Sequence, residues 1–223
     1  IFCGFFASTF EYLGICNFCH IFGIFQTQAW DCAELAKENG LKNVLVSNGF
    51  LNSEPLAELM PLIDAVNIDL KAMDDEFYRT VCQGRLEPVL AAIRQFHVAG
   101  VHLEVTNLLI PGYNDNEQQV DRLVDFVHSL GRDIPLHFSA YHPSWRLNAP
   151  PTPRQTLIRA RKQALDRLDW VYLGNVGGET GRDTICPDCS TTAIIRSGFQ
   201  ARVNVEKESA CTGCGRPLPF VMK

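Results

Sequence analysis

The sequence lacks the features of a membrane-anchored, secreted or DNA-binding protein. No uninterrupted apolar run approaches the roughly 20 residues of a spanning helix, and no basic segment precedes the apolar residues near the start, as a signal peptide requires. Basic runs longer than a pair are absent, and 20 Lys and Arg stand against 25 Asp and Glu. We therefore expect a cytoplasmic protein that makes no membrane contact and for which nucleic acid is a poor partner.

Charge is scarce near the start of the chain, where Glu11 is the only formally charged side chain among the first 25 residues, seven of which are phenylalanine. Beyond this segment the composition is ordinary.

A chain of 223 residues is long enough for one buried core plus an appendage. We predict an aromatic-rich segment (1–26), a main domain (27–180) and a small C-terminal module (181–223). Because the chain begins with Ile1, we also expect it to be a fragment or the product of an altered gene model.

Short apolar runs alternate with helical segments through the middle of the chain. The runs L-K-N-V-L-V-S-N, A-V-N-I-D-L-K, V-H-L-E-V-T-N-L-L-I, I-P-L-H-F-S-A-Y-H and W-V-Y-L-G-N are mostly apolar on both faces, which is typical of parallel strands. Helices are predicted over 29–39, 87–99, 115–130 and 152–168. This alternation predicts an α/β fold with right-handed crossovers. Five visible strands are too few for a closed eight-stranded barrel.

Polar side chains gather where these strands end, which is where α/β sheets hold their ligands. A turn or a cap explains any one of them, but a set at matching strand ends favours a binding site. Asp69 and Lys71 stand two apart and so point to the same side of a strand. A carboxylate beside an ammonium on the inner face of a barrel needs a partner or a ligand. The full set is Ser47, Asn48, Asp69, Lys71, Thr106, Asn107 and His142.

Nine cysteines in a protein that we expect to be cytoplasmic indicate metal or redox chemistry rather than disulfides, because thiols stay reduced in the cytosol. Four of them form C-P-D-C and C-T-G-C, separated by 21 residues: Cys186, Cys189, Cys211 and Cys214. Two such knuckles complete a tetrahedral site, so we predict a structural zinc ribbon. A second iron–sulfur cluster or a redox pair is the alternative. Cys32 and Cys82 stand alone and are expected to be small buried residues.

The ordered motifs resemble a known enzyme family. V-S-N-G-F, N-I-D-L-K, D-D-E-F-Y-R, G-R-L-E-P-V-L, L-E-V-T-N-L-L-I-P-G-Y-N-D, H-F-S-A-Y-H-P and L-G-N-V precede two C-x-x-C pairs. This set, from about Trp30 to Cys214, is similar to radical S-adenosylmethionine (SAM) enzymes of the pyruvate formate-lyase activating-enzyme type, and most of all to the AmmeMemoRadiSam system branch. The resemblance implies a partial (β/α) barrel of the radical SAM type. In that family a [4Fe–4S] cluster cleaves SAM reductively to a 5′-deoxyadenosyl radical.

The same resemblance implies roles for individual residues and partners. Lys71 and His142 are the implied catalytic side chains. Memo-type and Ammecr-type proteins are the implied partners. The substrate is a protein or a small molecule, and the sequence does not identify it. The implied SAM contacts are Ser47, Asn48, Asp69, Lys71, Thr106 and His142.

The cluster loop of the family, C-x-x-x-C-x-aromatic-C, is matched only in its second half, C-N-F-C from Cys16 to Cys19. Tyr12 stands where the first cysteine belongs, and twelve residues separate Cys3 from Cys16. Only ten residues, without a G-E-P-like motif, separate Cys19 from Trp30. Two interpretations stay open: a degraded remnant of the loop, or an unrelated N-terminal sequence. We expect this chain not to assemble a working cluster.

Two functional hypotheses follow. The first is an enzyme that abstracts hydrogen by radical chemistry, of which this chain is an incomplete copy. The second is a non-catalytic barrel plus zinc ribbon that acts as a protein-binding module.

Overall fold

The computed structural model describes residues 15–19, 26–144, 147–198, 200–205 and 209–219. The chain divides into two compact units, one of Gly14–Val176 and one of Ile1–Leu13 with Gly177–Lys223. Most of the predicted segment 1–26 lies outside the described residues. The three predicted domain ranges therefore stay a prediction.

Six parallel strands form the sheet of the larger unit, in the order in which they occur along the chain. Five of them are the strands that the sequence predicts, whereas the first was not predicted. The strands are β1 (Ile15–Cys19), β2 (Lys42–Ser47), β3 (Ala65–Asp69), β4 (His102–Leu109), β5 (Leu136–Ala140) and β6 (Val171–Gly174).

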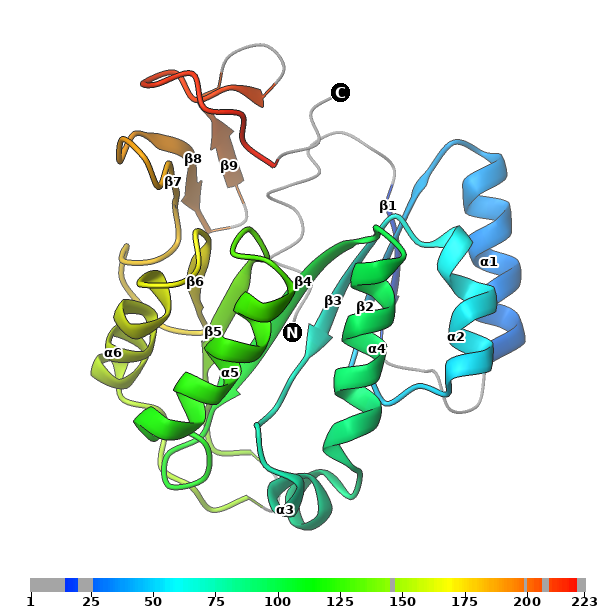
Figure 1. The fold of residues 1–223 in the computed structure, drawn as a ribbon, viewed down its shortest axis with the longest axis horizontal. Coiled ribbons are helices and arrows are strands. Elements are labelled where there is room, and N and C mark those ends of the chain that lie inside the picture. Colours follow the sequence, from blue (N-terminus) through cyan, green and yellow to red (C-terminus); the bar gives the residue numbers. More distant parts are fainter. Residues whose placement is uncertain (1–14, 20–25, 145–146, 199, 206–208, 220–223) are drawn as a thin grey trace. The chain divides into compact units, whose positions relative to one another are not determined.

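Helices connect successive strands, and the four predicted helices are confirmed to within a few residues. Each strand pairs in parallel with the next strand along the chain. Crossovers between such strands are right-handed as a rule, which places the connecting helices on one face of the sheet. Figure 1 shows α4 and α5 lying in front of β3 and β4. The helical elements are α1 (Gln26–Glu38), α2 (Ser53–Leu59), η2 (Met60–Leu62), α3 (Asp75–Phe77), the π-helical turn η3 (Tyr78–Cys82), α4 (Leu86–Val98), α5 (Glu117–Leu130) and α6 (Arg154–Leu165).

The face of the sheet that the helices cover is apolar. Leu45, Ile68 and Phe138 of the strands are fully buried in one core with Ile93 and Phe96 of α4. Full burial of a side chain of this size contributes roughly 1.5–3 kcal/mol. This packing fixes which face of each strand meets the helices and leaves the opposite, inner face to other residues.

The inner face carries buried polar side chains. Alternate residues of a strand point to opposite faces, and partners in register share a face. The register places Asn67 beside Glu104, Asp69 beside Thr106, and Thr106 beside His137. All five residues are buried. A polar set therefore crosses the inner face of β3, β4 and β5 toward the carboxyl ends of these strands.

The smaller unit contains a three-stranded antiparallel sheet of β7 (Thr184–Ile185), β8 (Thr192–Ser197) and β9 (Gln200–Val203). Its apolar core is small, with Ala193 and Ile194 among the buried residues. So small a core rarely folds without a metal or another crosslink.

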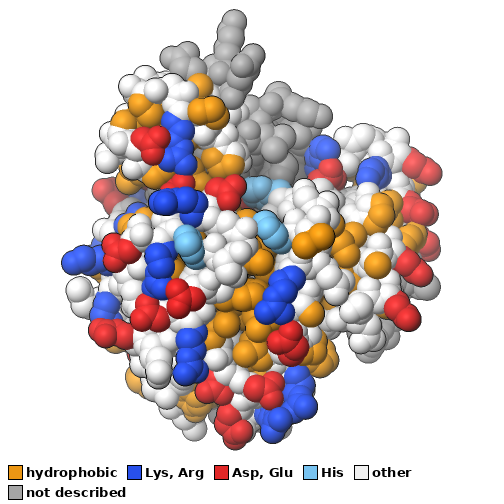
Figure 2. All heavy atoms as spheres, viewed as in Figure 1, with side chains coloured by type: hydrophobic (Ala, Val, Ile, Leu, Met, Phe, Trp, Pro, Cys, Tyr) orange, Lys and Arg blue, Asp and Glu red, His pale blue; other side chains and the backbone are white. Residues whose placement is uncertain are grey.

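Two surface observations agree with the composition. Within the described ranges, no helix is long and apolar enough to cross a membrane. Basic and acidic side chains are interspersed on the face that Figure 2 shows, and the described residues there form no extended basic patch.

Candidate functional site

A cavity of about 320 Å³ lies at the carboxyl ends of β2 and β3. This volume is within the range of small-molecule sites, which is about 300–1,000 Å³. The described residues that line it are Asn48, Phe50, Asp69, Lys71, Tyr78, Cys82, Gln83 and Gly84.

An ion pair stands in the wall of this cavity. The Lys71 Nζ lies 2.7 Å from the Asp69 Oδ2. The Asp69 side chain is 4% exposed and that of Lys71 is 27% exposed. An ammonium carries three donors, so Lys71 can hold the carboxylate and still offer donors to a ligand. The pair lies on one side of the chain, as the spacing of two predicts.

The turn after β2 brings Asn48 to the cavity and keeps Ser47 out of it. The Ser47 Oγ accepts a hydrogen bond from the Gly49 N–H at 3.1 Å, and the Asn48 Oδ1 accepts one from the Phe50 N–H at 3.0 Å. Gly49 has φ +70°, and a Cβ there would lie 2.7 Å from the Ile68 Cγ2. Only glycine fits this turn without strain. Ser47 is buried and is not among the described residues that line the cavity.

Two further predicted contacts lie elsewhere. The Thr106 Oγ1 donates to the Asn67 Oδ1 at 2.8 Å on the buried inner face. The His142 Nε2 lies 2.9 Å from the Asn175 carbonyl oxygen, and because a carbonyl only accepts, this nitrogen carries the proton. Neither Thr106 nor His142 lines the described part of the cavity. Of the six predicted SAM contacts, the cavity brings together Asn48, Asp69 and Lys71.

The sequence interpretation missed the contribution of the segment after β3. Tyr78 and Cys82, at the two ends of η3, line the cavity. Burial raises the pKa of Tyr78, so its hydroxyl stays protonated at neutral pH. Cys82 and Cys32 are exposed, so the prediction that both are buried is wrong. The motif D-D-E-F-Y-R was the available signal, but nothing in it indicated which side chains turn toward β3.

A carboxylate between two imidazoles lies on the inner face. The Glu104 Oε2 lies 2.8 Å from the His137 Nε2, and the Glu104 Oε1 lies 3.3 Å from the His102 Nε2. The His137 ring stacks on Tyr172 with centroids 5.1 Å apart. Burial alone raises the pKa of Glu104, but the hydrogen bonds with the two histidines outweigh it and lower that pKa. None of the sequence motifs indicated this cluster.

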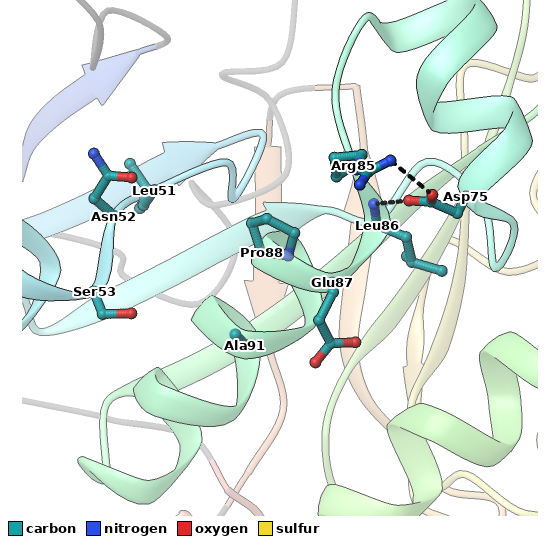
Figure 3. A pocket seen from close by; sticks show the side chains of 9 residues that line it. All are labelled: Leu51, Asn52, Ser53, Asp75, Arg85, Leu86, Glu87, Pro88 and Ala91. Carbon is teal, nitrogen blue, oxygen red and sulfur yellow. Dashed lines mark hydrogen bonds and ion pairs between the residues drawn. The ribbon is translucent and has the colours of Figure 1, made fainter.

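A second, more open cavity of about 650 Å³ lies beside the loops that follow the same two strands. In Figure 3 the Arg85 side chain points toward Asp75, with its Nη1 3.6 Å from the Asp75 Oδ2. The Asp75 Oδ1 also accepts from the Leu86 N–H at 3.0 Å. Asp75 and Arg85 pair with one another, and Glu87 pairs with Arg94 outside the cavity, all through side chains that are at least 42% exposed. We therefore take the cavity at Asp69 as the candidate site. The lining residues are Leu51, Asn52, Ser53, Asp75, Arg85, Leu86, Glu87, Pro88 and Ala91.

The four cysteines of the smaller unit come together. All four sulfur atoms lie within 4.8 Å of one another. Cys186 and Cys214 are 3.7 Å apart, and Cys189 and Cys211 are 3.5 Å apart, measured between Sγ atoms. A tetrahedral ion with Zn–S bonds of about 2.3 Å requires sulfur atoms about 3.8 Å apart. The residues therefore fit a four-thiolate metal site.

Thr191 favours the thiolate form of Cys189, one of these four cysteines. The Thr191 Oγ1 lies 3.3 Å from the Cys189 Sγ, and hydrogen bonds from Thr191 lower the pKa of this thiol. Metals bind the thiolate form. A Cβ at Gly213 would lie 2.2 Å from the Thr191 Oγ1, so only glycine leaves room for this contact.

The predicted cluster remnant has a different setting. Cys16 and Cys19 lie in strand β1, in register with Asn43 and Val46 of β2. Cys3 and Tyr12 lie outside the described residues. Among the side chains that the structure describes, Cys186, Cys189, Cys211 and Cys214 are the one group of three or more ligands close enough to share a metal ion. The side chains of Cys16 and Cys19 lie outside the described part of the chain, so their role as a cluster remnant stays a prediction.

The comparisons with known proteins agree on one superfamily. Residues 18–127 match the sequence model of the Radical SAM superfamily. An uncharacterized protein of Methanocaldococcus jannaschii is 42% identical over 198 residues, which cover 86% of this chain and 59% of that protein. The pyruvate formate-lyase 1-activating enzyme of Escherichia coli K12 is 25% identical over 114 residues, which cover 50% of this chain and 46% of the enzyme. This chain thus spans about half the length of the curated relatives it matches.

A solved structure supports the same fold. A domain of a pyruvate-formate lyase-activating enzyme from Bacteroides vulgatus superposes with a TM-score of 0.64 at 22% identity, covering 73% of this chain and 98% of that domain. The α/β fold with its parallel sheet is consistent with a radical SAM partial barrel, and the superfamily implies SAM and a [4Fe–4S] cluster. The chain therefore contains a radical SAM domain and is similar to pyruvate formate-lyase activating enzymes.

Proposed function

We propose that this chain binds SAM in the cavity at the carboxyl ends of β2 and β3, as part of a radical SAM enzyme of the activating-enzyme type. The observation that carries the proposal is the Asp69–Lys71 pair, held in the wall of a cavity of about 320 Å³ inside a radical SAM domain. Charged side chains this buried are rare without a partner or ligand to compensate them.

The donors and acceptors of this wall match the chemistry of SAM. SAM carries a carboxylate, an amino group, a sulfonium and ribose hydroxyls. The Lys71 ammonium can donate to the carboxylate or to a hydroxyl, the Asp69 carboxylate can accept from an amino group or a hydroxyl, and the Asn48 amide can do either. Asp69 ends β3, and Asn48 and Lys71 follow β2 and β3 within two residues, so all three lie at the carboxyl edge of the sheet.

For the whole protein we infer the reaction that the superfamily implies, reductive cleavage of SAM with a [4Fe–4S] cluster. The relative that is named for activating pyruvate formate-lyase favours a protein substrate. The AmmeMemoRadiSam branch, with Memo-type and Ammecr-type partners and a cytoplasmic location, remains our proposal from the sequence motifs. His142, Ser47 and Thr106 enter this proposal only through the family resemblance, because they are not among the described residues that line the cavity.

Calorimetric titration with SAM tests the binding site. We expect weak binding, because the described residues supply cavity contacts but no cluster to chelate the ligand. Asp69→Asn removes a charged acceptor and should weaken binding by about tenfold. Asp64→Asn is the matched control, since Asp64 also pairs with a lysine, Lys42, at 2.6 Å but does not line the cavity.

Each outcome decides between the hypotheses. Loss of affinity in Asp69→Asn alone supports the site. Binding that Asp69→Asn leaves unchanged places SAM elsewhere. A folded chain that shows no SAM binding at all favours the non-catalytic, protein-binding alternative.

A further inference from the structure

The backbone of Lys71 is held from both sides by side chains of other elements. Its N–H donates to the Tyr78 Oη at 3.0 Å. Its carbonyl oxygen accepts from the Asn107 Nδ2 at 3.1 Å and from the Asn114 Nδ2 at 2.6 Å. Lys71 lies just beyond β3, where the sheet no longer pairs its backbone. These three side chains take over the role of the sheet at this position.

The two asparagines are themselves fixed. Asn107, in β4, donates also to the Leu70 carbonyl at 2.7 Å. Asn114, in the turn after β4, donates to the Leu108 carbonyl at 2.8 Å, and its Oδ1 accepts from the Ile110 N–H at 2.7 Å. Both asparagines are 3% exposed. The Asn107 amide nitrogen thus makes two hydrogen bonds, and Asn114 is satisfied at both its nitrogen and its oxygen. Buried amides paired in this way hold one geometry, because another arrangement leaves polar groups without partners.

The residues that follow Lys71 are held in the same way. The Met73 N–H donates to the Gln119 Oε1 at 3.2 Å, from helix α5. The Leu70 N–H donates to the Thr106 carbonyl at 2.9 Å. The segment from Leu70 to Met73 is therefore attached to β4, to the turn after β4 and to α5. Connecting segments on a protein surface are usually more mobile than this, so the number of hydrogen bonds to this short segment indicates that its backbone is held in place.

A fixed backbone matters here because lysine has a long, flexible side chain. Four rotatable bonds separate the Lys71 backbone from the ammonium, so holding this side chain in one geometry costs rotamer entropy. Fixing the Cα restricts the positions that the ammonium can reach. Strand β3 sets the position of Asp69, so the distance between the Lys71 ammonium and the Asp69 carboxylate then varies less.

We propose that Tyr78, Asn107 and Asn114 are positioning residues that hold the Lys71 backbone so that its ammonium stays beside Asp69 in the cavity wall. The identity of the ligand rests on the proposed function, whereas the positioning role does not. None of the three touches the Lys71 ammonium in the hydrogen bonds described, so they act through the backbone.

Competitive lysine acetylation tests the positioning role without SAM. The full chain is treated with a limiting amount of an acetyl N-hydroxysuccinimide ester, and the Lys71:Lys42 acetylation ratio is read by peptide mass spectrometry. Lys42 is an internal reference, because it pairs with Asp64 at 2.6 Å and is similarly exposed, at 32%. Tyr78→Phe, which removes only the hydroxyl, and Asn114→Ala should each raise the ratio by about fivefold, the loss of one buried hydrogen bond.

Thr152→Val is the matched control. The Thr152 Oγ1 also donates to a backbone carbonyl, that of Leu109 at 2.6 Å, and Thr152 is also buried, but its described hydrogen bonds reach neither Lys71 nor the reference pair of Lys42 and Asp64. The ratio should stay constant in this variant. An unchanged ratio in both Tyr78→Phe and Asn114→Ala, or an equal rise in Thr152→Val, overturns the positioning role.

Calorimetry on the same variants separates this inference from the proposed function. If the cavity binds SAM, Tyr78→Phe should weaken that binding by about fivefold. A raised acetylation ratio with no SAM binding in the unsubstituted chain leaves the positioning role standing and removes SAM as the ligand. An unchanged ratio removes the positioning role whether or not SAM binds.

Discussion

Cys82 reports on the charge of Lys71 because both residues line the same cavity. Although Cys82 is exposed as a residue, partial desolvation of its thiol raises the pKa above the ordinary value of 9.0, whereas the positive charge of Lys71 lowers that pKa. Lys71→Met removes the lowering effect and leaves the raising one. We therefore expect this variant to move the alkylation profile of Cys82 to higher pH, since only the thiolate reacts.

Alkylation with iodoacetamide, followed at Cys82 by peptide mass spectrometry over a range of pH, measures this shift. Lys42→Met is the control, because it removes a cation that does not line the cavity. A Cys82 profile that stays in place in Lys71→Met, or that moves equally in both variants, contradicts the assigned geometry.

The residues of the site differ in how far the sequence could reveal them. Asp69 and Lys71 were grouped by a spacing of two along a predicted strand, but β3 ends at Asp69, so the contact between the two side chains depends on the segment that follows the strand. Ser47 was placed with them by its position at a strand end, but the turn at Gly49 holds its hydroxyl against the backbone. Tyr78 and Asn114 reach Lys71 from 7 and 43 residues away in sequence. No local pattern encodes such contacts.

At the scale of elements, β4 and β5 are joined by the Glu104 cluster as well as by their backbone. The pKa of Glu104 is lowered below its ordinary 4.5, because the histidine hydrogen bonds outweigh burial. The pKa of His102 is raised above its ordinary 6.5, because the hydrogen bond and charge of Glu104 outweigh burial. A lowered carboxyl pKa stabilises the fold above about pH 4.5, and a raised imidazole pKa stabilises it below about pH 6.5. The two contributions overlap between these values.

Glu104→Gln should therefore destabilise the larger unit most near pH 6, by about 3 kcal/mol, as removing one member of a buried ion pair does. The difference should shrink as the pH rises through the folded pKa of His102. Denaturant unfolding at about pH 6 and pH 8.5 measures both values. Glu87→Gln is the control, because Glu87 pairs with Arg94 at 2.9 Å on an exposed helix surface and should change the free energy of unfolding by under about 1 kcal/mol. A difference that grows toward alkaline pH is incompatible with the cluster as described.

Elements with a strong periodic pattern were predictable, whereas strand β1 and short elements such as α2, which lack such a pattern, were not. Helices α4 and α5 follow from apolar residues at helical spacing, and β2 to β6 from short runs that are apolar on both faces. Strand β1 contains C-N-F-C, and the two cysteines and the aromatic residue of this motif suggested a ligand loop rather than a strand. Its pairing with β2 depends on partners 27 residues away. Tertiary pairing rather than local preference defines such an edge strand.

At the scale of the whole molecule, the two compact units differ in what stabilises them. The larger unit has an extended apolar core shared by its strands and helices. The smaller unit has few buried apolar side chains but a group of four cysteine sulfurs within 4.8 Å. Metal removal should therefore affect the smaller unit alone.

We expect the anaerobically purified chain to contain about one zinc ion and little iron, because two C-x-x-C knuckles complete a closed four-thiolate site. Cys211→Ser should abolish the zinc and the unfolding transition of the smaller unit, since binding of a structural zinc is also folding free energy. The transition of the larger unit should remain. Elemental analysis and calorimetric unfolding with and without a chelator measure these outcomes.

Cys32→Ser is the control for this experiment, because Cys32 is an exposed cysteine on α1, far from any knuckle in sequence. It should leave the zinc content and both transitions unchanged. Iron–sulfur absorbance that survives Cys16→Ala with Cys19→Ala but disappears in Cys211→Ser would instead assign a cluster to the four-cysteine group. Thiolate sulfur binds both zinc ions and iron–sulfur clusters. In that case the smaller unit would therefore hold a redox centre rather than a structural ion.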